Sequence, residues 1–335
     1  MDIDTKSTLA RMTLPANFHD AQFVSEYGRI ESLRASRYGT RFSVIVIDIA
    51  GLAADADEIE TGEAAEALRK IAAAVLDSTR TCDVAGLMGF NRIAVLLPET
   101  DYFGSLVAIR KISKAVSGAV SGRKPALSVL ITHAAFPKDG KGFGELLSTA
   151  ARRSAQRRES LWEKNGFRDK LFWEIIADIE GRSYGGFDSA SFDAGSGLLL
   201  SDIFIDRINE LIISEASRNP HKRGVLIFAA KKISAGLPVI NALSFAGTIA
   251  TKIFLVGEGE DKLWDIRCAT PISIDDPRLR ETFFTFFFNE DTSYALICRE
   301  NWGATYSCFH TSDACLVEGL ITKFQSEYSL QEQLG

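Results

Sequence analysis

An arginine and an aspartate three residues apart, Arg80 and Asp83, are the first group in the sequence equipped to hold a ligand. A guanidinium can fork onto a phosphate or a base edge, or stack on a base, and a carboxylate accepts hydrogen bonds from ring N–H and amino groups. The same two residues could instead cap and pair where a helix ends and a strand begins. The two interpretations remain open from the sequence alone.

A second group, Gly89-Phe90-Asn91-Arg92-Ile93, begins shortly after Asp83 and falls at a predicted turn. It contains no carboxylate, whereas a divalent cation such as Mg²⁺ takes oxygen ligands. Asp48 ends an apolar stretch and is the one acidic residue left for such a role. We expect it to be a satisfied strand-end carboxylate, with Arg92 as its ion-pair partner, and we expect no metal.

The elements around these groups alternate between strand and helix patterns. Apolar, β-branched runs predict strands, and apolar residues at helical spacing predict helices. This alternation indicates an α/β fold in which helices cover a central sheet. The predicted strands are residues 41–51, 91–99 and 126–137, and the predicted helices are residues 63–80, 101–118 and 144–165.

Taken in order, several of these stretches resemble a GGDEF domain, the family that makes or senses cyclic di-GMP. The resemblance covers about residues 23–155 and predicts a domain over 23–160, preceded by a tail or helix over 1–22. It rests on FSVIVIDIAGL, ALRKIAAAVLDSTRTCDV, GFNRIAVLLPET, AIRKIS, LSVLITHAAFPKDG and ELLSTAARRS, with RxxD, LLPET and FPKDG at similar spacing.

The resemblance also implies that the synthetic site has degenerated. Active members of the family join two nucleotides with metal ions held by acidic residues. Their signature loop corresponds to residues 89–93, where only Gly89 matches. Phe90 replaces a second glycine, and Asn91 and Arg92 replace the two acidic residues. The upstream DxLTGLxNR motif and the nucleotide-gripping residues after Asp48 are missing too, so we expect no enzyme activity and no cofactor.

The Arg80–Asp83 pair, by contrast, matches the family's product-inhibition motif, RxxD. Family members add a basic residue from the following helix, where Arg110 and Lys111 lie in this sequence. The resemblance therefore implies a receptor that binds cyclic di-GMP through Arg80, Asp83, Arg110 and Lys111 and relays to its C-terminal half. The alternative is a scaffold that needs no nucleotide, forms a dimer and docks a protein partner through its Phe-rich region and last helix.

The second half predicts another α/β domain over residues 166–335. From about residue 220 onward its order of elements resembles a DICT-type sensory domain. A helix over 200–219 is predicted from the stripe Ile203, Ile205, Ile208, Leu211 and Ile212, with Ser201 or Asp202 as its cap. Further helices are predicted over 236–250 and 312–330, and strands over 224–230, 252–259, 293–300 and 304–310.

Three other features of this half have chemical potential. Five phenylalanines within residues 283–288 predict a segment between two layers, with a partner interface as the second interpretation. Cys308, His310, Asp313 and Cys315 lie close in sequence, but their spacing matches no zinc pattern, and Ser312 and Asp313 are better helix caps. A triad of Ser307 or Ser312 with His310 and Asp313 lacks a nucleophile elbow.

Composition and charge exclude several classes of protein. The chain of 335 residues has a net charge of -6, which argues against a broad nucleic-acid face. No apolar run is long enough to span a bilayer, and the acidic start of the chain does not predict a secretory signal. Five cysteines without a CxxC pair fit a reducing cytoplasm.

Overall fold

The computed structural model describes residues 14–52, 62–122, 127–184, 198–234, 236–259, 268–301 and 305–330. The chain divides into two compact units, the first ending at Gln156 and the second beginning at Arg157. Most of the predicted N-terminal tail and the glycine-rich stretch 185–197 lie outside the described residues. None of the described helices combines the length and hydropathy that a membrane crossing needs.

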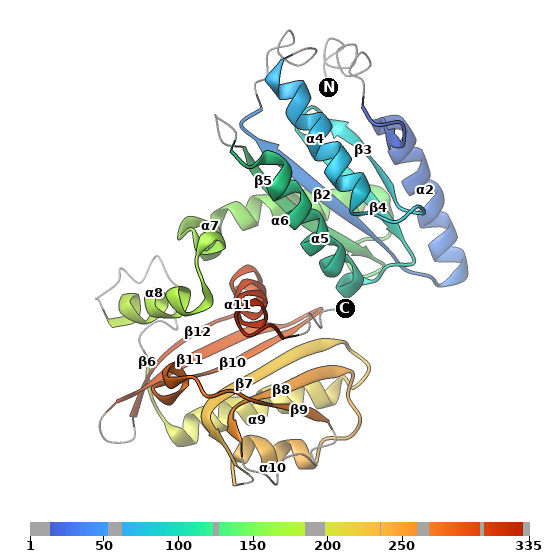
Figure 1. The fold of residues 1–335 in the computed structure, drawn as a ribbon. Helices are drawn as coiled ribbons and strands as arrows, with labels where there is room; N and C mark the ends of the chain where they lie inside the picture. Colours follow the sequence, from blue (N-terminus) through green and yellow to red (C-terminus); the bar gives the residue numbers. More distant parts are fainter. Residues whose placement is uncertain are drawn as a thin grey trace. The chain divides into compact units, whose positions relative to one another are not determined.

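The first unit is built on a five-stranded sheet with the order β1-β3-β4-β2-β5 (Figure 1). β1 pairs in parallel with β3, and the other pairs are antiparallel. α2 and α6 pack on one face of the sheet, and α5 packs against β2 and β5 and against α4. The elements are β1 (Phe18–His19), α2 (Ala21–Tyr38), β2 (Phe42–Ala50), α4 (Glu63–Asp77), β3 (Val84–Gly89), β4 (Arg92–Pro98), α5 (Tyr102–Val120), β5 (Ser128–Phe136) and α6 (Phe143–Glu159).

The predicted strands and helices of this unit are confirmed, with one exception. The predicted helix over 144–165 breaks at Ser160, and a short helix, α7 (Leu161–Lys164), follows. The Ser160 hydroxyl donates to the Arg157 carbonyl at 2.6 Å and accepts from the Glu163 N–H at 3.4 Å. A serine that bonds the backbone in this way ends one helix and caps the next.

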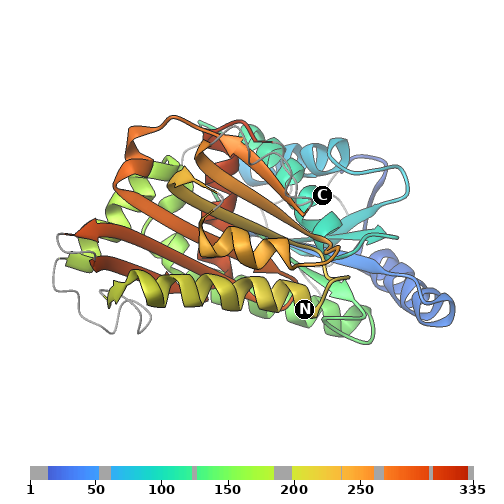
Figure 2. The same cartoon turned by 90° about the horizontal axis from the view of Figure 1, so that it is seen from below.

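The second unit contains a seven-stranded sheet with the order β6-β12-β11-β10-β7-β8-β9. β7, β8 and β9 run parallel and the remaining pairs are antiparallel. Figure 2 shows α9 and α10 together on one side of this sheet. The further elements are η1 (Phe167–Asp169), α8 (Phe172–Tyr184), β6 (Leu198–Ser201), α9 (Asp202–Arg218), β7 (Gly224–Ile233), α10 (Pro238–Ser244), β8 (Thr251–Gly259), β9 (Ala269–Ser273), η3 (Pro277–Arg280), β10 (Thr282–Asn289), β11 (Ser293–Asn301), β12 (Thr305–Thr311) and α11 (Ala314–Glu327).

The phenylalanine run forms β10, in the middle of this sheet, so the prediction of a segment between two layers is confirmed. Successive side chains of a strand point to opposite faces. Phe284 and Phe286 stack on each other at 4.5 Å between ring centroids and meet Phe172 of α8. Phe287, on the other face, joins the core beneath α9 and α10. Phe284, Phe286, Phe287 and Phe288 are buried and Phe283 is partly buried, so the run does not offer the docking surface that the scaffold alternative assigned to it.

The apolar stripe predicted for residues 200–219 is wrong in part. Ile203 is 75% exposed and Leu211 is 54% exposed. The helix instead buries Ile205, Asn209, Ile212, Ile213 and Ala216, which recur at the three- and four-residue spacing of one helix face. Asn209 is tolerated there because the Thr285 hydroxyl donates to its side-chain oxygen at 2.7 Å. The helix predicted over 236–250 is shorter, because α10 ends at Ser244.

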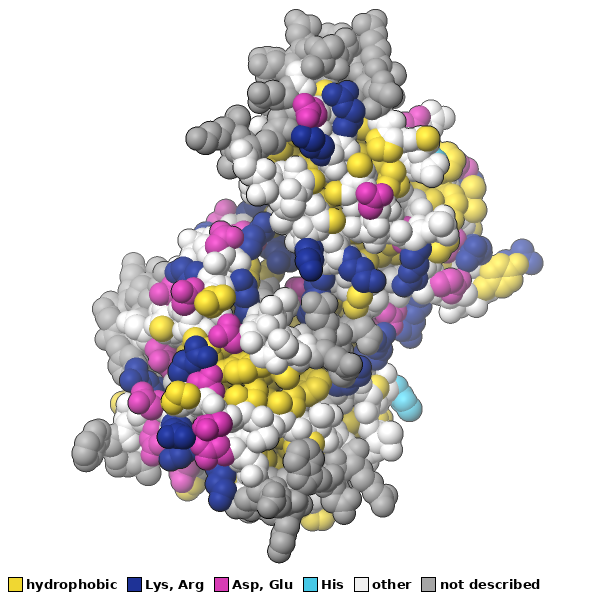
Figure 3. All heavy atoms as spheres, in the orientation of Figure 1, with side chains coloured by type: hydrophobic (Ala, Val, Ile, Leu, Met, Phe, Trp, Pro, Cys, Tyr) yellow, Lys and Arg dark blue, Asp and Glu magenta, His cyan; other side chains and the backbone are white. Residues whose placement is uncertain are grey.

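Charged side chains of both signs lie side by side on the second unit (Figure 3). One polar cluster ties α8, η3 and α11 together around Asp276. The Asp276 carboxylate accepts hydrogen bonds from Arg278 Nη2 and from the Tyr328 hydroxyl, each at 2.7 Å. The Tyr328 oxygen accepts in turn from Trp173 Nε1 at 2.7 Å, and the Arg278 guanidinium lies 4.8 Å from the Trp173 ring centroid.

This cluster predicts a specific loss of stability in acid. The hydrogen bonds from Arg278, followed by that from Tyr328, lower the pKa of Asp276 from 3.8 to about 2 against the opposing effect of burial. A carboxylate with a depressed folded pKa stabilises the fold above its unfolded pKa and loses that contribution as the pH falls from about 4 to about 2. We expect the free energy of unfolding, from urea melts, to fall less steeply over this window in Asp276→Asn than in the wild type. Asp275→Asn is the matched control, and equal slopes for Asp276→Asn and wild type would contradict the assignment.

Candidate functional site

The Arg80–Asp83 turn connects α4 to β3 and closes on its own backbone. The Asp83 carboxylate accepts from the Arg80 N–H at 2.7 Å, and the Asp83 N–H donates to the Arg80 carbonyl at 3.0 Å. These bonds give Asp83 the capping role that the sequence left open. Arg80 itself is exposed, and its charge acts on the Asp83 carboxylate. The turn is thus held by Asp83 while the cation of Arg80 projects from it.

The Asp83 carboxylate keeps one oxygen nearly unengaged. Oδ2 accepts from the Arg80 N–H, whereas the hydrogen-bond donor recorded for Oδ1 among the described residues is the Cys82 thiol, at 3.9 Å. Partial burial raises the pKa of Asp83, although the backbone hydrogen bond and the charge of Arg80 oppose this. A half-buried acceptor next to an exposed guanidinium can engage a ligand that carries both donors and negative charge, such as a purine nucleotide.

Sequence reasoning missed a residue beside this turn, Tyr27 on α2. Burial raises the pKa of Tyr27, and the charges of Glu31, Cys82 and Asp83 raise it further. Tyr27 packs against the apolar cluster that contains Val84, the residue after Asp83, so its ring lies near the turn and could support a base by stacking. The signal in the sequence was weak, because Tyr27 belongs to a helix that precedes the turn by some fifty residues.

Arg110 and Lys111 lie in the middle of α5, which packs against α4. Arg110 is half-buried and Lys111 is exposed. Neighbouring positions on a helix are about 100° apart, so the two side chains leave α5 in different directions and could not both serve one ligand from the same side. The structure thus leaves the two as separate candidates for a second basic residue.

Residues 89–93 form the hairpin turn between β3 and β4. Gly89 and Arg92 are paired across the turn, with Phe90 and Asn91 at its tip. The Asn91 carbonyl accepts from the Ile49 N–H at 2.8 Å, which fastens the turn to β2. Phe90 is half-buried and Ile93 is fully buried in the sheet. The turn therefore contributes to the packing of the unit and supplies no acidic side chain.

Asp48 and Arg92 form the expected ion pair. They are direct partners on the antiparallel strands β2 and β4, and Arg92 Nε donates to Asp48 Oδ1 at 2.7 Å. The Ser154 hydroxyl, from α6, donates to Asp48 Oδ2. The Asp48 side chain is 5% exposed, whereas that of Arg92 is 41% exposed. Each carboxylate oxygen thus has a donor from this chain, and the cation beside it is a guanidinium.

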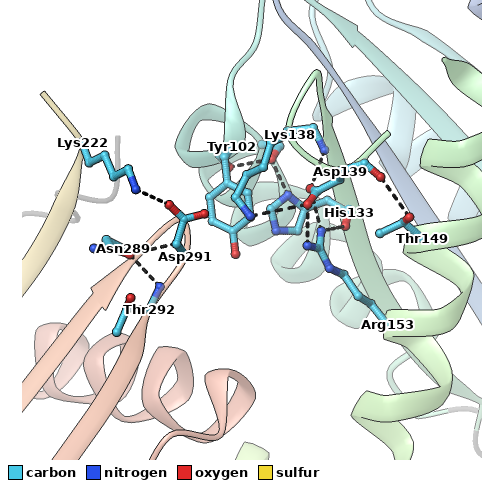
Figure 4. A network of polar contacts seen from close by, with 12 residues as sticks. Tyr102, His133, Lys138, Asp139, Thr149, Arg153, Lys222, Asn289, Asp291 and Thr292 are labelled. Atoms are coloured by element: carbon cyan, nitrogen blue, oxygen red, sulfur yellow. Dashed lines mark hydrogen bonds and ion pairs between the residues drawn. The ribbon is translucent and has the colours of Figure 1, made fainter. Parts of the chain in front are cut away.

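The residue before Ser154, Arg153, anchors α6 through an ion pair with Asp139 (Figure 4). Arg153 donates from its two terminal nitrogens to the two oxygens of Asp139, each at 2.8 Å, and Thr149 donates to the Asp139 carbonyl at 3.0 Å. Burial would raise the pKa of Asp139, but the hydrogen bonds from Arg153 and Ala135 bring it below its ordinary value. This forked pair fixes α6 against β5, and α6 then carries Ser154 to Asp48.

The clustered residues near β12 do not converge on a site. Cys308 faces Cys298 in the core, the ring of His310 lies 5.9 Å from that of Tyr294, and Asp313 caps α11 by accepting from two backbone N–H groups. Ser307 accepts from Asn301, so the triad drawn from the sequence is not assembled either. Within the described ranges, no three His, Cys, Asp or Glu side chains are grouped so that they could hold a metal ion.

Similar chains were found only among solved structures. The GGDEF domain of YfiN (TpbB) from Pseudomonas aeruginosa is 19% identical, with 44% of this chain and 91% of that chain covered and a TM-score of 0.36. The GGDEF domain of DgcB from Caulobacter crescentus, in complex with c-di-GMP, is 15% identical, with 44% and 88% covered and a TM-score of 0.38. The active GGEEF domain of a diguanylate cyclase from Vibrio cholerae is 15% identical, with 41% and 86% covered and a TM-score of 0.32.

No protein-family model matches the chain, and no curated protein matches it. The solved structures share less than a fifth of their residues with the aligned part of this chain.

Proposed function

We propose that the first unit is a GGDEF-like domain that has lost synthesis and acts as a receptor for cyclic di-GMP. The observation that carries the proposal is the turn at residues 80–83, where the exposed guanidinium of Arg80 stands beside the half-buried carboxylate of Asp83, whose Oδ2 accepts the Arg80 N–H. Arg80 would fork onto guanine or a phosphate, and Asp83 Oδ1 would accept from the ring N–H and amino group of guanine. Arg110 or Lys111 would supply a second cation.

The loss of synthesis is proposed from the Asp48–Arg92 pair. A catalytic Mg²⁺ needs several carboxylate oxygens, and it is repelled by a fixed cation. Here the retained carboxylate already bonds Arg92 and Ser154, and the turn at 89–93 adds no acid. We therefore expect no cyclic di-GMP when the protein is incubated with GTP and Mg²⁺, and formation of that product would overturn this part of the proposal.

In this proposal the second unit is a DICT-like sensory or partner-binding domain of a cytoplasmic signalling protein. Ligand binding shifts the population of states in which that unit engages a protein partner, rather than driving a reaction. A ligand can shift such an equilibrium only by its difference in affinity between the states.

Calorimetric titration of the full chain with cyclic di-GMP tests the receptor role. We expect binding to the wild type, and a loss of about 10- to 100-fold in affinity in Arg80→Ala and in Asp83→Ala, since each substitution removes charge-assisted hydrogen bonds. Arg37→Ala is the matched control, because Arg37 is another exposed arginine of the same unit and lies at the end of α2. The receptor role is wrong if the wild type gives no binding heat, or if Arg80→Ala binds as tightly as Arg37→Ala.

A nucleotide-independent scaffold is the second candidate, and the edge of the second unit favours it. β6 and the first ten residues of α9 expose a set of large apolar side chains, which on a protein surface often mark a protein contact. These are Leu198, Leu199, Ile203, Phe204 and Leu211, with Phe204 64% exposed. The scaffold, as a homodimer or with another protein, would lose its association in Phe204→Asp and keep it in Arg80→Ala. Sedimentation of both variants separates the two candidates.

A further inference from the structure

Two cysteines of the second unit face each other across neighbouring strands. Cys298 of β11 and Cys308 of β12 are direct partners in the antiparallel register. Cys298 is 0% and Cys308 is 1% exposed. They share an apolar cluster with Ile205 of α9 and Leu296 of β11. Directly opposed residues of antiparallel strands have Cα atoms about 4.5–5.5 Å apart, which lies inside the range of about 4.4–6.8 Å that a disulfide spans.

The two sulfur atoms are closer than a packing contact allows. Their Sγ atoms are 2.6 Å apart. Non-bonded heavy atoms settle at about 3.5–4.0 Å, whereas a disulfide bond measures about 2.05 Å. The two side chains therefore already point at each other across the strand pair. The other thiols have different surroundings, with Cys82 exposed in the first unit and Cys268 directed at the Leu243 carbonyl.

We propose that Cys298 and Cys308 form a reversible disulfide, which makes the β11–β12 pair of the second unit a redox-responsive element. The oxidant is a small-molecule disulfide. The thiolate of one cysteine attacks a sulfur of that molecule and releases one small thiol. The thiolate of the other cysteine then attacks the mixed disulfide and releases the second small thiol. Two protein thiols are oxidised, one small disulfide is reduced to two thiols, and the protons remain with solvent and the released thiols.

The burial of the two cysteines limits the rate at which they can be oxidised. Burial raises the pKa of the Cys298 thiol, and the neighbouring Cys308 sulfur raises it further, so the attacking thiolate is scarce in the closed fold. Cys308 lies next to the edge of the sheet, because Leu198 of the short edge strand β6 is its partner in the register. β6 has four residues, and Leu199 is 71% exposed. Opening of this edge would admit the oxidant, and the disulfide once formed would tie β12 to β11.

The test uses the full chain. The protein is first reduced with dithiothreitol, the dithiothreitol is removed, and the protein is then incubated with oxidised or reduced glutathione. Free thiols are blocked with N-ethylmaleimide under denaturing conditions, and tryptic peptides are identified by mass spectrometry. Cleavage after Arg280, Arg299 and Lys323 places Cys298 on peptide 281–299 and Cys308 on peptide 300–323. We expect these two peptides to be joined after oxidation and separate again after dithiothreitol.

Variants assign the bond and its effect. Cys298→Ala and Cys308→Ala are each expected to abolish the joined peptides, whereas Cys315→Ala, a matched cysteine on the same peptide as Cys308, keeps them. Oxidised wild type should melt about 4–8 °C higher than reduced wild type, and the difference should vanish in Cys298→Ala. Should either alanine variant fail to fold, fragment spectra of the joined wild-type peptides still distinguish Cys308 from Cys315. Separate alkylation of Cys298 and Cys308 after oxidation, or a bond to Cys315 instead, overturns the proposal.

Discussion

Replacing Arg92 by alanine is expected to lower the free energy of unfolding by about 3 kcal/mol, because the buried Asp48 carboxylate loses its arginine partner. The Asp48 carboxylate is 5% exposed and receives the Arg92 Nε at 2.7 Å. Without the guanidinium, the buried Asp48 carboxylate loses the cation that now donates to its Oδ1 and keeps the Ser154 hydroxyl as a donor to its Oδ2. Arg92 is 41% exposed, so water can partly replace it, and the loss should fall at the lower end of about 3–5 kcal/mol for broken buried pairs.

The matched control is Arg29→Ala, which removes an ion pair on the surface of the same unit. Arg29 pairs with Glu26 at 2.7 Å, and both side chains are more than half exposed. Such pairs contribute about 0–1 kcal/mol. The free energies of unfolding of the variants are compared by urea unfolding. The double variant Asp48→Asn/Arg92→Ala should recover part of the loss, because the neutral amide at position 48 needs no cation beside it. If Arg92→Ala is no less stable than Arg29→Ala, the pair is not the internal replacement for a cation that the proposed function requires.

This pair also shows how far the sequence leads. Asp48 and Arg92 could be matched in advance because each lies at the end of a strongly apolar, β-branched stretch, and such stretches predict strands. Ser154 could not be foreseen as a donor to Asp48, because it is 106 residues away and reaches its place through the Arg153–Asp139 anchor. Contacts of that kind are set by tertiary packing and leave no local pattern.

Weak strands were missed for a related reason. β3 contains two glycines and has little strand propensity of its own, and it is a strand because it pairs with β4 on one side and β1 on the other. The four residues of β6 are likewise defined by their pairing with β12. On α9, the sequence offered more apolar residues than one face can hold, so periodicity alone could not assign Ile203 and Leu211 to the exposed side.

The candidate ligand turn was found from the sequence, whereas its surroundings were not. RxxD marks Arg80 and Asp83, but the hydrogen bond from the Arg80 N–H to the Asp83 carboxylate depends on the turn between α4 and β3. Tyr27 approaches this turn only because α2 packs along β3. A sequence motif gives the residue types of a site, whereas the tertiary fold determines which other residues surround them.

Truncating Phe284 to alanine is expected to have the largest effect of all, a loss of about 3–5 kcal/mol in the free energy of unfolding. Phe284 is fully buried at the centre of the second unit. Its ring lies 4.5 Å from that of Phe286, 5.3 Å from that of Phe324 and 5.4 Å from that of Phe172, measured between centroids. The substitution removes contacts to the strand itself and to α8 and α11 at once.

Phe245→Ala is the control that separates this loss from the loss of a phenylalanine as such. Phe245 follows α10 and is 90% exposed, so its truncation should change stability by no more than about 0.5 kcal/mol. Urea unfolding can be monitored by the fluorescence of the four tryptophans, one of which, Trp173, has its ring 6.2 Å from that of Phe284. The size of the loss depends on how far the surrounding rings relax into the cavity. Since Phe284 sits between a rigid sheet and two helices, little relaxation is available, and a loss below about 2 kcal/mol would mean that the phenylalanine run is less tightly packed than its ring distances indicate.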